Sequence, residues 1–191
     1  MKPFYYKYLD FLPPLPDHIQ EKVRSGENLT EKINQSTDRI LTSQQKQYQN
    51  GYLERWRMDA DTFQWIKDNI TDRFIDISSQ IMIGDRQGPH TDKLRLFHLY
   101  WICDLGDPKA CTVWYQAKGK NQRLDEFMIY ENYDELNEVF RDTLQANRWI
   151  LFDSRVIHAV EGCGHGTRKG LTVDLESVPD WIIDRANLAR E

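Results

Sequence analysis

Short segments with apolar side chains at alternate positions are the feature that most constrains how this chain can fold. They occupy much of the sequence between residues 74 and 175, and turns rich in glycine and proline separate them. Alternation with a period of two puts every second side chain on the same face, which is typical of a β-strand. We therefore predict strands over residues 74–83, 94–103, 111–115, 149–160, with an interruption at Asp153-Ser154, and 169–175.

Helical spacing marks the region before these strands and one stretch among them. Residues 17–26, which end at Gly26, and the stretch that follows Asp59 each predict a helix. Residues 132–144 predict a further helix, because four apolar side chains would share one face. These four are Leu136, Val139, Phe140 and Leu144.

Both ends of the chain are expected to pack against the strand region. The aromatic and proline-rich residues 1–16 predict a surface arm or strand. The tail predicts a short helix around Trp181, packed on the sheet or folded over the mouth of a site. At 191 residues we expect one domain, with an N-terminal arm and helices (1–73), a core (74–176) and a C-terminal tail (177–191).

Taken together, these elements predict a mainly β fold with added helices. Short strands at fairly even spacing are typical of a double-stranded β-helix, the jelly-roll core that cupins also have. Residues 27–50 and Lys118–Arg123 are polar and predict surface connections. The basic side chains of the second stretch could meet an acidic substrate, although a solvated hairpin tip is the preferred interpretation.

Composition narrows the functional classes. The formal net charge of -5 argues against a broad phosphate-binding face, so nucleic acid is a disfavoured partner. Cys103, Cys111 and Cys163 form no CxxC pair and predict free thiols in a reducing compartment. The sequence contains neither an apolar run long enough to span a bilayer nor the apolar stretch of a signal peptide. We therefore expect a soluble, cytoplasmic protein.

A histidine and an aspartate two residues apart, His90 and Asp92, follow the turn signal Gly88-Pro89. On an extended backbone their side chains point the same way, so both can reach one cation. A loop histidine beside a solvated turn aspartate is the open alternative. The third ligand would be His158, at the end of a distant apolar run. Two histidines and one carboxylate, with other metal positions open, form the ligand set of non-haem Fe(II) oxygenases.

The strand predicted over residues 94–103 has two unlike faces. Apolar side chains occupy one face, namely Phe97, Leu99 and Trp101. His98 and Tyr100 lie on the other face and are therefore candidates for lining a cavity. For His98, a buried histidine with a hydrogen-bond partner is the preferred interpretation.

Over roughly residues 74 to 176 the chain resembles the 2-oxoglutarate- and Fe(II)-dependent oxygenases. It is most similar to small stand-alone members near the prolyl-4-hydroxylase and phytanoyl-CoA-hydroxylase-like branches. The residues that carry the resemblance are Gly88–Asp92, Thr112 after a strand and a turn, Leu151–Ser154 leading to His158, and Arg168 with Thr172.

This resemblance implies roles for individual residues. His90, Asp92 and His158 would be the iron ligands. Arg168, ten residues after His158, would bind the distal carboxylate of 2-oxoglutarate, because a planar guanidinium meets a carboxylate with two parallel bonds. Thr172, on the same strand face, would add a hydrogen bond to that carboxylate.

Three positions depart from the family's patterns. Many relatives contact the co-substrate with a tyrosine shortly before the His-x-Asp motif, where this chain has Met82-Ile83, and Tyr100 is expected to replace it. Asp174 stands where the nucleic-acid-demethylating branch has a second arginine. Gly170 stands where plant-type small-molecule oxidases have a serine. The chain therefore matches neither subgroup closely.

The function that the resemblance implies is that of an Fe(II)- and 2-oxoglutarate-dependent dioxygenase. Such an enzyme uses O2, admits ascorbate as a reductant, and hydroxylates a C–H bond with release of succinate and CO2. Halogenation is disfavoured because Asp92 is present. The expected substrate is a small molecule or a peptide or protein side chain. Two alternatives stay open: a cupin-type metalloenzyme that does not use 2-oxoglutarate, and a non-catalytic ligand-binding barrel.

Overall fold

The computed structural model describes residues 1–26, 29, 31–33, 51–92, 95–119, 130, 133–164 and 166–190. The polar connections predicted at 27–50 and Lys118–Arg123 lie largely outside these residues. The helices are α1 (Asp17–Ser25), α3 (Ala60–Asn69) and α4 (Asp180–Arg185). The strands are β1 (Tyr6–Tyr8), β2 (Gly51–Arg57), β3 (Phe74–Gly84), β4 (Gln87–His90), β5 (Phe97–Asp104), β6 (Cys111–Ala117), β7 (Leu136–Asp142), β8 (Trp149–Asp153), β9 (His158–Glu161) and β10 (Thr167–Leu175).

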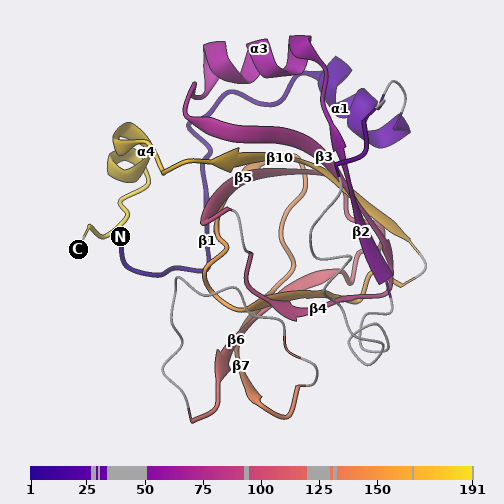
Figure 1. Cartoon of the computed structure of the whole chain (residues 1–191), viewed down its shortest axis with the longest axis vertical. Helices are drawn as coiled ribbons and strands as arrows, with labels where there is room; N and C mark the ends of the chain where they lie inside the picture. Colours follow the sequence, from indigo (N-terminus) through magenta and orange to yellow (C-terminus); the bar gives the residue numbers. More distant parts are fainter. Residues whose placement is uncertain are drawn as a thin grey trace.

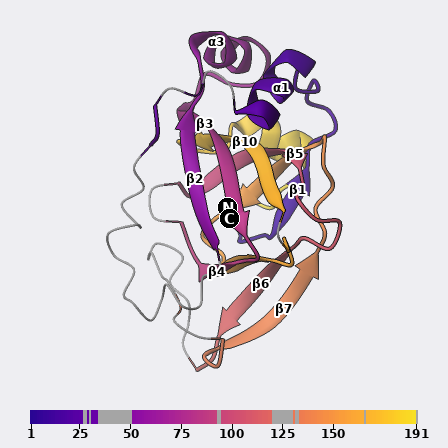
Figure 2. The same cartoon turned by 90° about the vertical axis from the view of Figure 1, so that its right-hand side faces the viewer.

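In the described part of the chain, these strands form two antiparallel sheets. The larger sheet has the order β1-β8-β5-β10-β3-β2, and the smaller sheet has the order β4-β9-β6-β7. Figures 1 and 2 show the smaller sheet lying below the larger one, with the inner faces of the two sheets toward each other. The predicted mainly β fold with a double-stranded β-helix core and added helices is confirmed.

Helices α1 and α3 cover the outer face of the larger sheet (Figure 1). Alternate residues of β5 and β10, such as Leu99 and Val173, are fully buried there against Ile19 and Ile66 of the two helices. Burying one such side chain contributes about 1.5–3 kcal/mol. The outward-facing apolar set predicted for the β5 strand is confirmed, and its alternate residues, His98 and Tyr100, face inward.

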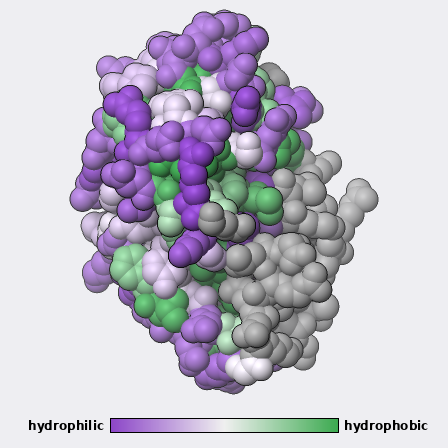
Figure 3. All heavy atoms as spheres, turned by 90° about the vertical axis from the view of Figure 1, so that its left-hand side faces the viewer, coloured by the Kyte–Doolittle hydropathy of each residue, from purple (hydrophilic) through white to green (hydrophobic). Residues whose placement is uncertain are grey.

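The two ends of the chain pack as a strand and a helix. Strand β1 pairs with β8, with Tyr6 opposite Phe152. In the tail, Ile182 of α4 is fully buried in the core beneath the helices, so the tail packs on the sheet. Figure 3 shows the face that carries α4 and both termini, where hydrophobic side chains form patches among hydrophilic ones. Within the described residues, every helix is too short or too polar to cross a membrane.

The prediction of a helix over residues 132–144 is wrong, because Leu136–Asp142 form strand β7. This strand pairs with β6 at the edge of the smaller sheet. The apolar residues at helical spacing do not share one buried face: Leu136 and Leu144 belong to different clusters, while Val139 and Phe140 are 43% and 36% exposed. Cross-strand pairing with a neighbouring strand outweighs the helical pattern here.

Candidate metal centre and its pocket

His90 and His158 are brought together by strand pairing in the smaller sheet. His90 ends β4, His158 begins β9, and the two residues are directly opposite each other in the antiparallel register. Opposed residues in such a pair carry their side chains on the same face, only a few ångströms apart. The centres of the two imidazole rings are accordingly 4.5 Å apart.

Asp92 completes a group of three potential metal ligands. Its backbone N–H donates to the carbonyl of Ser154 at 3.0 Å, which holds the loop after β4 against the turn after β8. One ligand atom each from His90, Asp92 and His158 lies within 4.8 Å of the other two. The three residues that the sequence singled out as metal ligands therefore converge in space.

Hydrogen bonds orient both imidazoles. The Nδ1 of His90 lies 2.8 Å from the carbonyl oxygen of Gly88, and the Nδ1 of His158 lies 2.9 Å from that of Val156. A carbonyl oxygen only accepts, so each Nδ1 carries the proton and each Nε2 offers a lone pair. This is the orientation in which protein histidines bind metals.

The protonation states also suit a divalent cation. Burial alone would raise the pKa of Asp92, but the charge of Arg95 and the nearby histidines hold it well below its ordinary value. Burial, and next to it the neighbouring His90, lower the pKa of His158 to about 4. At neutral pH the site therefore presents a carboxylate and a neutral imidazole, the forms that bind metals.

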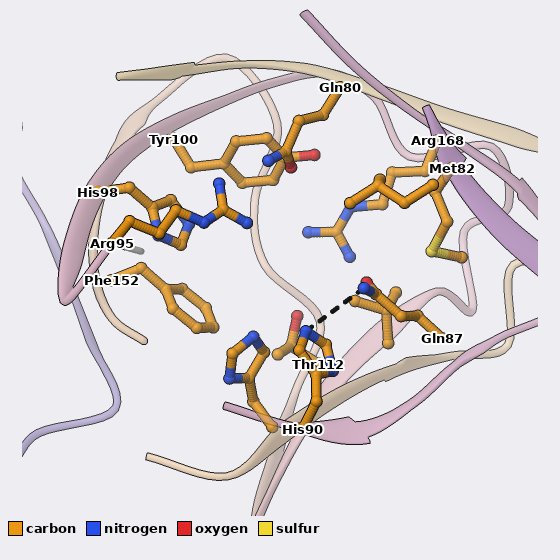
Figure 4. A pocket seen from close by; sticks show the side chains of 13 residues that line it. Gln80, Met82, Gln87, His90, Arg95, His98, Tyr100, Thr112, Phe152 and Arg168 are labelled. Carbon is orange, nitrogen blue, oxygen red and sulfur yellow. Dashed lines mark hydrogen bonds between the residues drawn. The ribbon is translucent and has the colours of Figure 1, made fainter. Parts of the chain in front are cut away.

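A pocket of about 470 Å³, counted with its open mouth, lies between the two sheets beside this group. Figure 4 shows the guanidinium groups of Arg95 and Arg168 entering it from opposite sides, with His90 below them. The amide nitrogen of Gln87 lies 3.3 Å from the Nε2 of His90, the atom that would face a metal. Apolar walls come from side chains that include Met82 and Phe152.

Arg168 lies at one end of this pocket and is only 4% exposed. Its Nε has no hydrogen-bond partner among the described residues, and neither does the buried hydroxyl of Thr112, which also lines the pocket. The guanidinium of Arg168 lies 5.5 Å from the ring centre of Tyr100. Buried polar atoms are nearly always hydrogen-bonded, so Arg168 and Thr112 have hydrogen-bonding capacity left for a polar group or water in this pocket.

The sequence analysis also singled out Thr172 and His98. Thr172 does not line the pocket; its hydroxyl donates to Asp174 at 3.2 Å and accepts from Arg95 at 3.3 Å. His98 lines the pocket, and its Nδ1 lies 2.8 Å from the hydroxyl of Ser154. Burial, and after it the charge of Arg95, lower the pKa of His98 to about 3. His98 is thus a buried, hydrogen-bonded histidine that also contributes to the pocket wall.

Arg95 is a site residue that the sequence analysis did not identify. It follows Asp92 by three residues, and its Nε donates to the carboxylate of Asp92 at 2.9 Å. It also donates to Asp174 on β10 at 3.1 Å. One signal could have revealed a polar interior: Ser78 and Gln80 alternate on β3, a strand that the structure buries on its inner face.

No protein-family model and no curated protein matches this sequence. Among solved structures, the chain is similar to an oxidoreductase of the 2OG-Fe(II) oxygenase family from Burkholderia pseudomallei, with 13% identity, 82% of this chain and 78% of that chain covered, and a TM-score of 0.41. It is also similar to the epimerase SnoN in complex with Fe3+, alpha-ketoglutarate and nogalamycin RO, with 8% identity, coverage of 92% and 93%, and a TM-score of 0.39.

The vicilin of Corylus avellana is matched at 11% identity over 66% of this chain, with a TM-score of 0.35. This chain spans only 29% of the vicilin's length.

Proposed function

We propose that this protein is an Fe(II)- and 2-oxoglutarate-dependent dioxygenase that hydroxylates a C–H bond of its substrate. One observation carries the proposal: two of the three potential metal ligands, His90 and His158, line the same pocket as Arg168, and Asp92 lies beside them. The first group suits a metal with open positions, and the arginine suits a carboxylate held beside that metal.

The donor set fits Fe(II). His90 and His158 would bind it through Nε2, and Asp92 would bind it through a carboxylate oxygen. Two imidazoles and one carboxylate are the ligands that non-haem Fe(II) oxygenases use, with the remaining positions free for co-substrate and O2. When bound, the iron would supply the activation of O2.

The other end of the pocket fits the distal carboxylate of 2-oxoglutarate. Arg168 would donate to that carboxylate through its guanidinium, and the hydroxyl of Thr112 would add a hydrogen bond. Tyr100 packs beside the guanidinium and keeps it oriented. In this arrangement Thr172 would help to orient Arg95 and Asp174, since its hydroxyl is hydrogen-bonded to both.

The residues of the chain position the reactants and exclude water. The overall reaction is the conversion of 2-oxoglutarate, O2 and a C–H substrate into succinate, CO2 and the hydroxylated product, with one oxygen atom going to succinate and the other to the product. The apolar walls at Met82 and Phe152 keep the reacting region dry. A small molecule or a peptide side chain is the substrate class proposed here, and nucleic acid is disfavoured by the net charge of -5.

Anaerobic titration tests this proposal. Metal-free protein is titrated with Fe(II) and then with 2-oxoglutarate, and the weak visible charge-transfer band of the chelate is recorded. We expect the band in the native protein and a co-substrate Kd raised by about tenfold or more in Arg168→Ala, as for the loss of hydrogen bonds to a charged group.

Lys169→Ala is the matched control for Arg168→Ala. Lys169 is the next residue of β10, but its ammonium group bonds the carbonyl of Arg24 on the other side of the sheet. We therefore expect native binding in this variant. Bound iron without a band would reject 2-oxoglutarate as co-substrate and favour a cupin-type metalloenzyme. Absence of iron binding would favour a non-catalytic barrel.

A further inference from the structure

The two carboxylate oxygens of Asp92 face different partners. Oδ1 lies 3.7 Å from the Nε2 of His90 and therefore faces the metal group. Oδ2 lies 2.9 Å from the Nε of Arg95. One oxygen of this carboxylate is thus directed at the metal position, while the other is held by a guanidinium.

Arg95 is held rigidly from the opposite side. It is 9% exposed, and its Nη1 donates to Asp174 at 3.1 Å and to Thr172 at 3.3 Å. Asp174 in turn accepts from Arg55 of β2 at 2.5 Å. Two guanidinium groups therefore alternate with two carboxylates, and the chain of bonds connects Asp92 in the loop after β4 to β10 and β2 of the larger sheet.

We propose that Arg95 is a positioning residue that restricts Asp92 to binding the metal through one oxygen, Oδ1. This rests on the proposed metal site but not on 2-oxoglutarate. A carboxylate with both oxygens free can bind a cation with either one or two of them. Two-oxygen binding would occupy a position that a chelating co-substrate or O2 needs. The bond from Arg95 holds Oδ2 and keeps that position open.

Arg55 provides the matched control for this role. Both arginines are nearly buried, with side chains 12% exposed for Arg55 and 10% for Arg95, and both donate to Asp174. Only Arg95 also donates to Asp92. Substituting either arginine leaves Asp174 with one guanidinium, but only an Arg95 substitution releases the metal ligand. If Arg95 affected the metal site only through its bond with Asp174, Arg55→Met and Arg95→Met would weaken metal binding alike.

Mn(II) binding to the metal-free protein tests the proposal without requiring turnover. Electron paramagnetic resonance measures affinity, and water-proton relaxation reports the number of water molecules on the bound ion. We expect Arg95→Met to lower Mn(II) affinity by about tenfold or more, the usual effect of losing a residue that orients a metal ligand. We also expect one fewer water on the ion, because Asp92 then binds through both oxygens.

Arg55→Met should keep the native affinity and the native water number. Arg95→Lys should bind Mn(II) with an affinity between those of the native protein and Arg95→Met, because one ammonium cannot replace both Nε and Nη1. If Arg95→Met does not fold, Arg95→Lys is compared with Arg55→Met in its place. Native affinity and water number in both Arg95 variants would overturn the proposal, as would equal losses in Arg95→Met and Arg55→Met. If the native protein does not bind Mn(II), or if His90→Ala binds Mn(II) as tightly as the native protein does, the proposed metal site itself is wrong.

Discussion

Replacing Gly170 with alanine should displace Tyr100 from the pocket wall. A Cβ at position 170 would lie 2.5 Å and 2.7 Å from two ring carbons of Tyr100, and 2.8 Å from the carbonyl oxygen of Trp101. Carbon atoms in ordinary contact are about 3.5–4.0 Å apart, so the ring must move by about 1 Å. The buried ring, 8% exposed, has little room for that movement.

The magnitude follows from overpacking. Adding a methyl group to a tightly packed interior costs about 1–3 kcal/mol of unfolding free energy. For a chain of this size each kcal/mol corresponds to about 2–4 °C in Tm, so Gly170→Ala should lower Tm by about 2–12 °C. The backbone adds no strain, because Gly170 is not among the glycines with positive φ. Binding of 2-oxoglutarate should also weaken, since Tyr100 packs against Arg168.

Thermal unfolding of four metal-free proteins provides the assay: native, Gly170→Ala, Tyr100→Leu and the double variant. Leucine lacks the ring carbons that meet the new methyl group, so Gly170→Ala should cost less in the Tyr100→Leu background, with a coupling of about 0.5–3 kcal/mol. The remaining cost comes from the carbonyl of Trp101. An equal cost in both backgrounds, or no cost in the native background, would refute the proposed contact.

Three further perturbations have expected outcomes. His98 has a pKa of about 3 in the folded protein, below the ordinary 6.5, so between pH 3 and pH 6.5 it takes up a proton on unfolding. The unfolding free energy should therefore fall as the pH drops below about 6.5, by up to about 1.4 kcal/mol per pH unit. His98→Phe should make this pH dependence weaker in urea titrations of the metal-free protein from pH 7 to 5. Thr112→Val should raise the Kd for 2-oxoglutarate of the Mn(II)-loaded protein by about tenfold, measured by calorimetry, without lowering the Tm of the metal-free protein, because its hydroxyl has no partner among the described residues. Asp174→Asn should lower the unfolding free energy in urea by about 3–5 kcal/mol, because Arg55 then loses its counter-charge and Arg95 keeps only that of Asp92.

Each of these outcomes has a result that would contradict it. Identical pH slopes in native and His98→Phe protein would show that this imidazole is protonated alike in the folded and unfolded states. An unchanged Kd in Thr112→Val would place 2-oxoglutarate away from that hydroxyl. A loss below about 1 kcal/mol in Asp174→Asn would mean that water already screens the buried charges.

Residues 132–144 show where local pattern fails. Leu136, Val139, Phe140 and Leu144 have the spacing of a helix face, yet the segment pairs as an edge strand. An edge strand can leave Val139 and Phe140 partly exposed, so its sequence lacks the strict alternation that a strand buried on one face requires. The neighbour that decides between helix and strand, β6, lies outside this segment of sequence.

The features that could be predicted from the sequence are local. They are the strands with a period of two, the helices that follow Pro16 and Asp59, and the placement of His90 and Asp92 on one side of the backbone. Such features depend on side chains a few residues apart, whose relative directions follow from backbone geometry alone.

Which distant side chains meet depends on how the strands pair and pack. His158 lies opposite His90 only because β4 and β9 pair in that register, and Arg95 reaches Asp174 only because the loop after β4 packs against β10. Register and packing depend on contacts across the whole sheet, and a shift of one residue would turn every side chain to the other face. The orientation of the Asp92 carboxylate is therefore a property of the assembled fold and could not be read from its neighbours in sequence.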